Sequence, residues 1–263
     1  MLIFLKLGGS LITEKNHPYT PRPGRIADLA VQIMEALREN PDLRLVLGHG
    51  SGSFGHEAAQ KYNTRKGVAG QDGWHGFAEV WYQASTLNRI LIDSLHRVGL
   101  PVLTISPAAS ITAHDGKVFI WDIFPLQTAL DNGLLPVIHG DVVFDDVRGG
   151  TILSTENLFS HLARHLKPQR ILLAGLEAGV WENFPNRTCL IRDITPEHFA
   201  RQIASLGGAA GADVTGGMKS KVLEMLTLVE QVPGLEVQIF SGEDPDAVRL
   251  TLLGAKPGTC LHC

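Results

Sequence analysis

Short hydrophobic segments alternate with longer amphipathic segments along nearly the whole chain. The hydrophobic segments are almost continuously apolar and are predicted to be buried strands: residues 2–7, 43–48, 101–106, 135–140, 169–175 and 235–240. Strands that are apolar on both faces are typical of parallel sheets covered by helices on both sides. The pattern therefore predicts an open αβα sandwich with a mainly parallel central sheet.

Two of the amphipathic segments have the spacing of helices that face a core. The first places these residues on one helical face: Ile26, Leu29, Ala30, Ile33 and Leu37. The second, over residues 76–98, does the same with Phe77, Val80, Trp81, Ala84, Leu87, Leu91, Leu95 and Val98. The sequence contains no repeat, low-complexity segment or clear linker, and we expect a single domain over residues 1–263.

The composition restricts the classes of function. A net charge of −4 argues against a surface for nucleic acid or anionic membranes, so we expect neither partner. Any anionic ligand must be bound locally, by a few lysines and backbone amides. The apolar run at the N-terminus is too short for a signal peptide, and no run reaches the ~18 apolar residues of a membrane helix, so we expect a cytoplasmic protein. Cys189, Cys260 and Cys263 do not form a disulfide framework, and the last two are expected on a terminal strand or tail.

Glycines gather where the predicted strands end, which is where open parallel sheets bind ligands. In the segment KLGGSLITEK, residues 6–15, Lys6 is followed by Gly8, Gly9 and Ser10. Paired glycines let the backbone approach an anion, and Lys6 and Lys15 would add positive charge. The segment is neither a Walker A loop nor a GxGxxG motif, and a plain turn is the alternative interpretation.

The segment LVLGHGSGSFGHEAAQ, residues 45–60, is the second such strand end. It contains the glycines Gly48, Gly50, Gly52 and Gly55. A helix expected to begin near Ser53 would direct its amides and its dipole at a phosphate. His56 lies about one turn into that helix and could donate a charge-assisted hydrogen bond to the same group. A lone histidine is more often a surface or packed residue, but the flanking glycines favour a ligand here.

A third strand end carries His139, Gly140 and Asp141, with a hairpin expected through DDVRGG after them. Asp141 either orients a ligand or a lysine, or ends the strand in a turn. We expect His139 to be packed rather than chemically active.

A fourth glycine-rich segment, DVTGGMKSKVLEML, precedes an amphipathic helix. Gly216 and Gly217 lie before it, and Lys219 and Lys221 lie in its first turn. Lysine is unfavourable beside the positive end of the helix dipole unless a polyphosphate binds there. We expect this role for Lys221, whereas Lys219 is equally well explained as solvated.

Three of these features together resemble the amino acid kinase superfamily: KLGGS, the glycine-rich strand end near residue 50, and DVTGGM with a lysine three residues after the methionine. The resemblance extends from Lys6 to the final PGTCL segment. KLGGSLITEK, GHGSGSFGHE and PVIHGDVVFD are similar to the isopentenyl phosphate kinases in particular, because acetylglutamate, glutamate and aspartate kinases lack the histidine that ends GSFGH. The resemblance implies ATP-dependent phosphorylation of isopentenyl phosphate to isopentenyl diphosphate, in the alternate mevalonate route of isoprenoid biosynthesis, by a homodimer.

The resemblance also implies roles for single residues. The nucleotide would contact Lys6, Gly8, Gly9, Ser10, Gly52, Glu156, Gly175, Trp181, Gly216 and Lys221. The acceptor phosphate would be held by Gly50, Ser51, Gly52, Gly55, His56, Gly140 and Asp141. The catalytic residues would be Lys6, Lys15, His56 and Lys221. Residues 1–165 would bind the acceptor and residues 166–263 the nucleotide.

The sequence departs from the family pattern in two places, a helix start and a loop. Glu156 stands where the superfamily usually has an aspartate that orients the active-site lysines. The segment LEAGVW, residues 176–181, corresponds to the family's adenosine-side loop and carries Glu177 and Ala178 in place of the residues more common in the family, which predicts an altered nucleotide preference.

The chemistry agrees with this interpretation. Phosphoryl transfer needs positioning and charge neutralisation more than covalent participation, which lysines and glycine amides supply. A phosphate monoester, with a second pKa near ~6, is already anionic at neutral pH and needs no general base, so His56 is assigned to binding and charge stabilisation. Mg²⁺ is implied by the nucleotide, and no metal site made of protein ligands is expected.

An isoprenoid acceptor also requires an apolar slot. The start of the helix over residues 76–98 is its expected location, with Phe77, Val80, Trp81 and Ala84 as candidates and ordinary core packing as the alternative. Two other functions remain open: a fosfomycin-type or other small phosphate or phosphonate kinase of the same fold, and a non-catalytic nucleotide-binding sensor.

Overall fold

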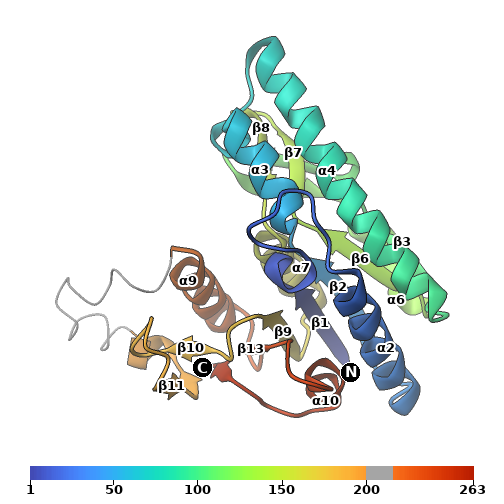
Figure 1. Ribbon diagram of the computed structural model, residues 1–263, viewed down its shortest axis with the longest axis vertical. Helices are drawn as coiled ribbons and strands as arrows, with labels where there is room; N and C mark the ends of the chain where they lie inside the picture. The colour runs from blue at the N-terminus through green and yellow to red at the C-terminus, as the bar shows by residue number, and fades with distance from the viewer. Residues whose placement is uncertain (200–215) are drawn as a thin grey trace.

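The computed structural model describes residues 1–199 and 216–263, and in these ranges an eight-stranded sheet forms the centre of the molecule (Figure 1). The strand order is β12-β14-β13-β9-β1-β2-β6-β3. The strands are β1 (Leu2–Leu7), β2 (Arg44–His49), β3 (Val102–Thr104), β6 (Leu135–His139), β9 (Arg170–Gly175), β12 (Asp193–Ile194), β13 (Glu236–Ser241) and β14 (Thr259–Leu261). Every neighbouring pair is parallel except β13 and β14. The predicted mainly parallel sheet is confirmed.

Helices cover both faces of this sheet, which confirms the predicted αβα layers. One face packs against α2 (Pro23–Glu39), α4 (Gly70–Arg97) and α10 (Ala247–Leu252). The other packs against α6 (Phe124–Asp131), α7 (Thr155–Leu166) and α9 (Gly216–Gln231). Figure 1 shows α2 and α10 side by side at the foot of the molecule, and the two helices are in contact.

The alternation of side chains along β1 decides which residues face which layer. Ile3, Leu5 and Leu7 belong to the core under α2 and α4. Phe4 belongs to the opposite core and packs against Phe159 of α7. Because successive strand residues point to opposite faces, Lys6 lies on the Phe4 side, toward α7 and α9. The alternation of side chains along β1 therefore points Lys6 toward the helices that carry Glu156 and Lys221.

A second sheet lies beside the first, in the order β5-β4-β7-β8. It consists of β4 (Ile111–His114), β5 (Lys117–Trp121), β7 (Asp141–Asp145) and β8 (Gly149–Leu153). The β7–β8 hairpin was predicted, but β4, β5 and the separate sheet were not. In Figure 1 this sheet lies in the upper part of the molecule with α3 (Gly52–Tyr62) and the start of α4.

Short elements complete the description: α1 (Gly9–Ile12), η1 (Thr64–Lys66), α5 (Pro107–Ser110), and the paired strands β10 (Val180–Trp181) and β11 (Leu190–Ile191). Two boundaries differ from the prediction. The long helix α4 begins at Gly70 rather than at residue 76. Gly216 and Gly217 form the first residues of α9 instead of preceding it, and the first three residues of the DVTGGM segment, 213–215, lie outside the described residues.

The three cysteines are free thiols, with Cys260 buried on β14 and Cys189 and Cys263 exposed. Within residues 1–199 and 216–263, no helix combines the length and the apolar character needed to cross a membrane.

Candidate active site

The carboxylate of Glu156 forms an ion pair with Lys6 and lies 3.9 Å from Nζ of Lys221. Ser154 caps α7 by accepting a hydrogen bond from the amide of Asn157, which fixes Glu156 in the first turn of that helix. An acidic side chain is favourable at this positive end of the helix dipole. Residues from β1, α7 and α9 therefore meet in one group, as the sequence predicted for Lys6 and Lys221.

Burial and charge determine the protonation state of this group. Burial alone would raise the pKa of Glu156, but the charges of Lys6 and Lys221 lower that pKa to about 2. Burial and the charge of Lys6 lower the pKa of Lys221, against the attraction of Glu156. The carboxylate is thus ionised at neutral pH. Two cations and one anion leave a positive excess that suits phosphate oxygens.

The two glycine-rich loops that follow β1 and β2 touch each other through bare backbone. A Cβ on Gly9 would come within 2.5 Å of Gly52 Cα, and a Cβ on Gly50 would come within 2.9 Å of Gly9 N. Packing of one loop on the other therefore already requires glycine at these positions. The contact also brings the predicted nucleotide loop, Gly8–Ser10, directly against the predicted acceptor loop, Gly50–Gly52.

Other glycines at these strand ends differ in what surrounds them. Gly48 leaves room for Phe159, whose Cζ would lie 2.7 Å from an added Cβ. Gly140 donates its amide to the carbonyl of His49 at 3.2 Å. A Cβ on Gly175 would meet no atom within 4 Å among the described residues, so packing does not require glycine there. The predicted nucleotide contact of Gly175 therefore stays a prediction that packing neither requires nor opposes.

His56 is exposed on the first part of α3. Partial desolvation lowers the pKa of its imidazole, and the positive charges of Arg65 and Lys6 lower it further. The imidazole therefore lies within electrostatic reach of the lysine group. A bound anion would reverse this effect and favour the imidazolium.

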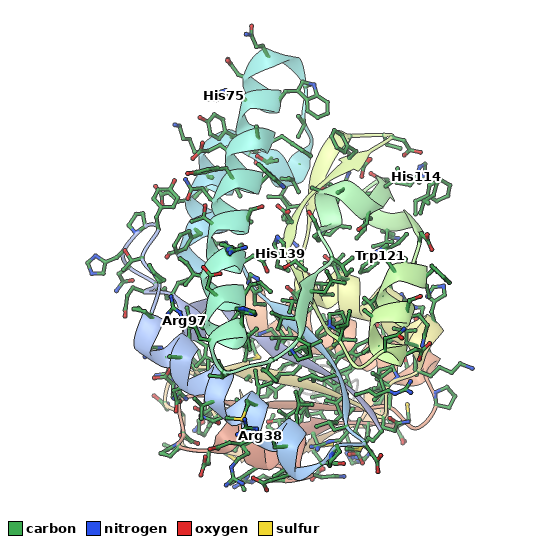
Figure 2. All side chains as sticks on the ribbon, turned by 90° about the vertical axis from the view of Figure 1, so that its right-hand side faces the viewer. Arg38, His75, Arg97, His114, Trp121 and His139 are labelled. Atoms are coloured by element: carbon green, nitrogen blue, oxygen red, sulfur yellow. The ribbon has the colours of Figure 1, made fainter. Side chains whose placement is uncertain are left out.

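His139 and Asp141 are buried rather than open to a ligand; Figure 2 shows His139 in the interior of the molecule. His139 stacks on His49, with ring centroids 5.2 Å apart and an interplanar angle of 8°. Its Nε2 lies 3.4 Å from Oδ2 of Asp141, and burial raises the pKa of Asp141 against the effect of His139. His49 is held by Asn88 of α4 at 3.1 Å. The expectation that His139 is packed agrees with this arrangement.

Glu177 follows β9 and Trp181 lies on β10, both on the predicted nucleotide side. Trp181 donates its Nε1–H to Glu177 at 3.0 Å, and Arg187 donates to both carboxylate oxygens of Glu177 at 2.7 and 3.0 Å. Burial would raise the pKa of Glu177, but these hydrogen bonds and the charges of Arg187 and Lys15 lower it. Lys15 is exposed, and its charge thus acts on the nucleotide side. No sequence pattern pointed to Arg187.

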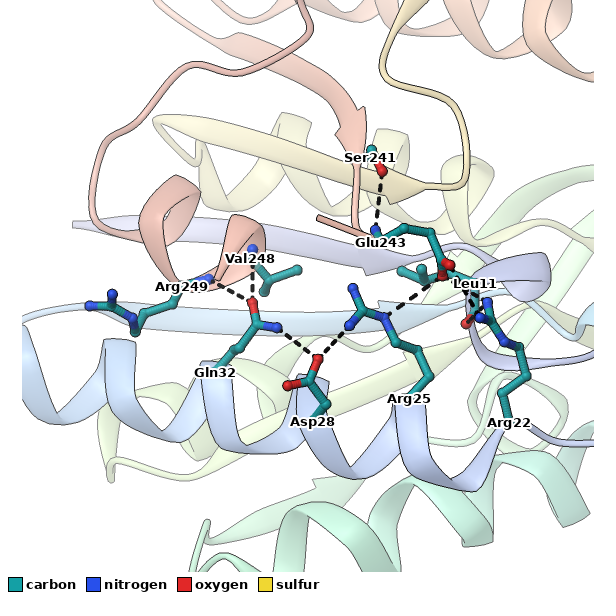
Figure 3. A network of polar contacts seen from close by, with 9 residues as sticks. All are labelled: Leu11, Arg22, Arg25, Asp28, Gln32, Ser241, Glu243, Val248 and Arg249. Atoms are coloured by element: carbon teal, nitrogen blue, oxygen red, sulfur yellow. Dashed lines mark hydrogen bonds and ion pairs between the residues drawn. The ribbon is translucent and has the colours of Figure 1, made fainter. Parts of the chain in front are cut away.

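A network of polar contacts anchors the loop that carries Lys15 (Figure 3). Arg22 donates to the carbonyl of Leu11 at 3.2 Å and to both oxygens of Glu243 at 2.7 and 3.2 Å. Farther along α2, Gln32 accepts the amide of Val248 at 3.0 Å. The network connects the segment after β1 with the segment after β13.

The model of the amino acid kinase family matches residues 1–241. The chain is 33% identical to the isopentenyl phosphate kinase of Methanocaldococcus jannaschii over 268 residues, which cover 98% of both chains. It is 32% identical to that of Methanothermobacter thermautotrophicus over 259 residues, 96% of both chains. A crystal structure of isopentenyl phosphate kinase superposes with a TM-score of 0.83 at 30% identity, covering 99% of this chain and 100% of the other.

Proposed function

Since the chain belongs to the amino acid kinase family, we propose that it transfers the γ-phosphoryl group of ATP to isopentenyl phosphate and forms isopentenyl diphosphate. The relatives that it matches over nearly their full length carry this activity in their names. The structural observation that carries the proposal is the group of Lys6, Glu156 and Lys221 beside two touching glycine-rich loops.

The donor side of the proposed site is formed by the loop after β1 and the start of α9. Gly9 and Ser10 bind the phosphates through backbone amides, because the first amides of a helix have no partner within it. The amide of Gly8 already donates to the carbonyl of Ala174 at 2.8 Å, so Gly8 contributes close approach of the backbone rather than a hydrogen bond. Gly216, in the first turn of α9, contributes in the same way. Gly175 and Trp181 border the adenosine. In this proposal residues 166–263 bind mainly the nucleotide, and residues 1–165 mainly the acceptor.

Mg²⁺ would enter with ATP and would be held mainly by phosphate oxygens and water. Lys6 and Lys221 beside the phosphate loops are cations, so they do not bind a metal ion, and the carboxylate of Glu156 is already engaged by both of them. These side chains therefore leave the ion to the phosphates and water. When bound, the ion neutralises charge on the transferred group. The residues of this chain have the remaining task of positioning.

The acceptor side is formed by Gly50, Ser51, Gly52 and Gly55, with His56 on the adjoining helix. Because the acceptor loop touches the donor loop, an acceptor phosphate held there lies next to the γ-phosphate. The lysines neutralise charge that develops on the transferred oxygens, and Glu156 orients them. The acceptor oxygen is already anionic, so no residue has to remove a proton, and His56 binds the phosphate. Lys15 acts from the nucleotide side.

An apolar cluster next to the acceptor loop is the proposed site of the isoprenoid tail. It consists of Ala58, Val68, Phe77, Val80 and Val142, all buried. Ala58 lies two residues after His56, and Val142 follows Asp141. Trp81, also a candidate from the sequence, is 44% exposed, and we leave it out of the tail site. A fosfomycin-type kinase would need a small polar surface here, so the apolar character of this cluster favours the five-carbon acceptor.

We also propose a cytoplasmic homodimer. Phe119 and Ile120 on strand β5, at the edge of the four-stranded sheet, are 60% and 58% exposed, and Phe124 is 71% exposed. Large exposed apolar side chains on and just after an edge strand make this strand a candidate interface. Light scattering on the wild type and on Phe119→Glu tests this: a monomeric wild type would refute it, and a dimer that the variant dissociates would support it.

A coupled assay of ADP release tests the function. It uses Mg-ATP with isopentenyl phosphate, dimethylallyl phosphate, geranyl phosphate, fosfomycin, acetylglutamate and UMP. Turnover concentrated on the five-carbon phosphates is expected. Turnover on fosfomycin instead would preserve the phosphate site but refute the tail site, and no turnover with any acceptor would favour a nucleotide-binding sensor.

A further inference from the structure

The side chain of Thr13 connects the two glycine-rich loops. Its hydroxyl donates to the carbonyl of Gly9 at 2.8 Å and accepts the amide of Ser53 at 3.0 Å. Thr13 is only 1% exposed. One buried hydroxyl thus joins a carbonyl of the donor loop to an amide of the acceptor helix.

This hydroxyl supplies the cap that α3 lacks. Ser51, the N-cap residue of α3, makes no side-chain hydrogen bond of the capping kind. A helix begins with several amides that have no partner inside it, and a side-chain oxygen normally accepts from one of them. Here the oxygen comes from Thr13, 40 residues earlier in the chain. The position of the first turn of α3, which leads to His56, therefore depends on a residue of the donor segment.

The backbone conformation and the missing Cβ of Gly52 both fit this contact. Gly52 has a φ of +50°, which few other residues adopt readily, and a Cβ there would overlap Oγ1 of Thr13 and lie 2.8 Å from the carbonyl of Gly9. Gly52 thus keeps open the space in which the hydroxyl reaches Ser53. The conformation of Gly52 and the hydrogen bond of Thr13 therefore favour the same arrangement of the two loops.

Thr13 also closes the base of the loop that carries Lys15. Its amide donates to Gly9 at 2.9 Å, and its backbone forms an isolated antiparallel bridge with Pro21. The amide of Arg22 donates to Ile12 at 2.8 Å beside it. The donor loop, the acceptor helix and the Lys15 loop meet at this one residue.

We propose that Thr13 is a positioning residue that sets the distance and angle between the donor phosphate and the acceptor phosphate. The inference rests on the proposed function for its kinetic consequence, but its structural content does not depend on the identity of the substrate. Small displacements of reacting groups are costly, on the order of 10²-fold in rate for about 1 Å. Loss of the hydroxyl should therefore slow the chemical step while each substrate still binds its own loop.

Three variants separate this role from general packing. Thr13→Val removes the hydroxyl and keeps the shape, whereas Thr13→Ser keeps the hydroxyl. Thr86→Val is the matched control, because the hydroxyl of Thr86 donates to the carbonyl of Tyr82 at 2.8 Å within α4, away from both loops. Thr13→Ala replaces Thr13→Val if that protein does not fold.

The first measurement is steady-state kinetics with Mg-ATP and isopentenyl phosphate. We expect kcat of Thr13→Val to fall on the order of 10²-fold with little change in either KM, and Thr13→Ser and Thr86→Val to resemble the wild type. Wild-type kcat in Thr13→Val, or a Thr13→Ser variant as slow as Thr13→Val, overturns the inference. A wild type inactive on isopentenyl phosphate refutes the proposed function instead.

The second measurement needs no substrate. Amide hydrogen exchange at Ser53 should be roughly tenfold faster in Thr13→Val than in the wild type, because its acceptor is gone, and unchanged in Thr13→Ser and Thr86→Val. Unchanged exchange in Thr13→Val overturns the inference whatever the kinetics show.

Discussion

The carboxylate of Glu156 in the first turn of α7 is ion-paired with Nζ of Lys6 on β1. The same carboxylate lies 3.9 Å from Lys221 of α9, so the side chain holds two lysines from different elements at one point. Glutamate at this position is one methylene longer than the aspartate usual in the superfamily, and its carboxylate contacts both lysines. We propose that it keeps the orienting role.

Glu156→Gln should weaken both stability and turnover. The substitution leaves two partly buried cations without their counter-charge, and removing one partner of a buried ion pair costs about 3 kcal/mol of unfolding free energy. Urea denaturation at pH 7 measures this, with Glu156→Asp as the matched variant that keeps the charge. An unfolding free energy unchanged in Glu156→Gln would show that the ion pair does not stabilise the fold.

The low pKa of Glu156 predicts a pH dependence in acid. The pKa falls from an ordinary 4.5 to about 2 in the folded protein, so the unfolded chain binds the proton first. The stabilisation is complete above pH 4.5 and is lost as the pH falls toward 2. The difference in unfolding free energy between the wild type and Glu156→Gln should therefore shrink over this range, and a constant difference would contradict the assignment.

His56→Ala should impair the acceptor and leave the nucleotide nearly unaffected. Loss of a charge-assisted hydrogen bond to phosphate is expected to weaken acceptor binding by about 2 kcal/mol, roughly 30-fold in Kd. Calorimetric titration with isopentenyl phosphate and, separately, with ATP measures the two affinities. Equal losses for both ligands would refute the division between the acceptor and donor loops.

The pKa of His56 predicts that acceptor binding takes up protons. Desolvation and the charges of Arg65 and Lys6 keep the free imidazole largely neutral at pH 7, and a bound phosphate raises its pKa again. Acceptor affinity should therefore increase as the pH falls from about 8 toward 7. Over this range the phosphate, with a second pKa near ~6, remains mostly dianionic, so the added proton goes to His56. Titrations in buffers of different ionisation enthalpy detect this uptake, and the same uptake in His56→Ala would assign it to another group.

Phe77→Ala should let the proposed tail site accept longer isoprenoid acceptors. Phe77 is 8% exposed and packs on Phe144, with ring centroids 5.0 Å apart. Its removal opens space beside the proposed tail site and costs about 3 kcal/mol of stability. The ratio of kcat/KM for geranyl phosphate to that for isopentenyl phosphate should increase about tenfold, a gain of the size that burial of extra apolar groups gives. Trp81→Ala, on the exposed side of the same helix, is the control, and an equal increase there would refute the assignment.

His49 predicts a separate loss of stability in mild acid. Burial and the neighbouring His139 lower the pKa of His49 to about 3, whereas the unfolded chain titrates near 6.5. Because the unfolded state binds the proton first, the unfolding free energy should fall as the pH drops from 6.5 toward 3, by up to about 1.4 kcal/mol per pH unit. His49→Gln removes this titration. Identical pH dependence in the variant and the wild type would exclude His49 as the cause.

The central sheet could be predicted because its strands are apolar on both faces. Residues 2–7 and 169–175 of the prediction became β1 and β9 almost without change. The second sheet could not be predicted in the same way. Strand β5 contains the continuous apolar run VFIW, which is typical of a buried strand, yet Phe119 and Ile120 are exposed. Hydrophobicity alone therefore does not show that this strand lies at the edge of a separate sheet.

The candidate site was predicted where local sequence carries the signal and missed where it does not. A lysine before a pair of glycines is visible in the sequence, and Lys6 and Lys221 do lie together. The bond between Thr13 and Ser53 joins residues 40 positions apart, and no local pattern announces it. The glycines illustrate a related limit, since loop packing explains Gly9 and Gly52 as well as a ligand does.

The bond formed in the reaction is the most direct test of the whole account. Phosphorus NMR of the purified protein with Mg-ATP and isopentenyl phosphate should show the monophosphate signal replaced by the two coupled signals of a diphosphate, in step with the formation of ADP. Release of ADP with inorganic phosphate alone, or an isopentenyl phosphate signal that stays unchanged, would contradict transfer to this acceptor.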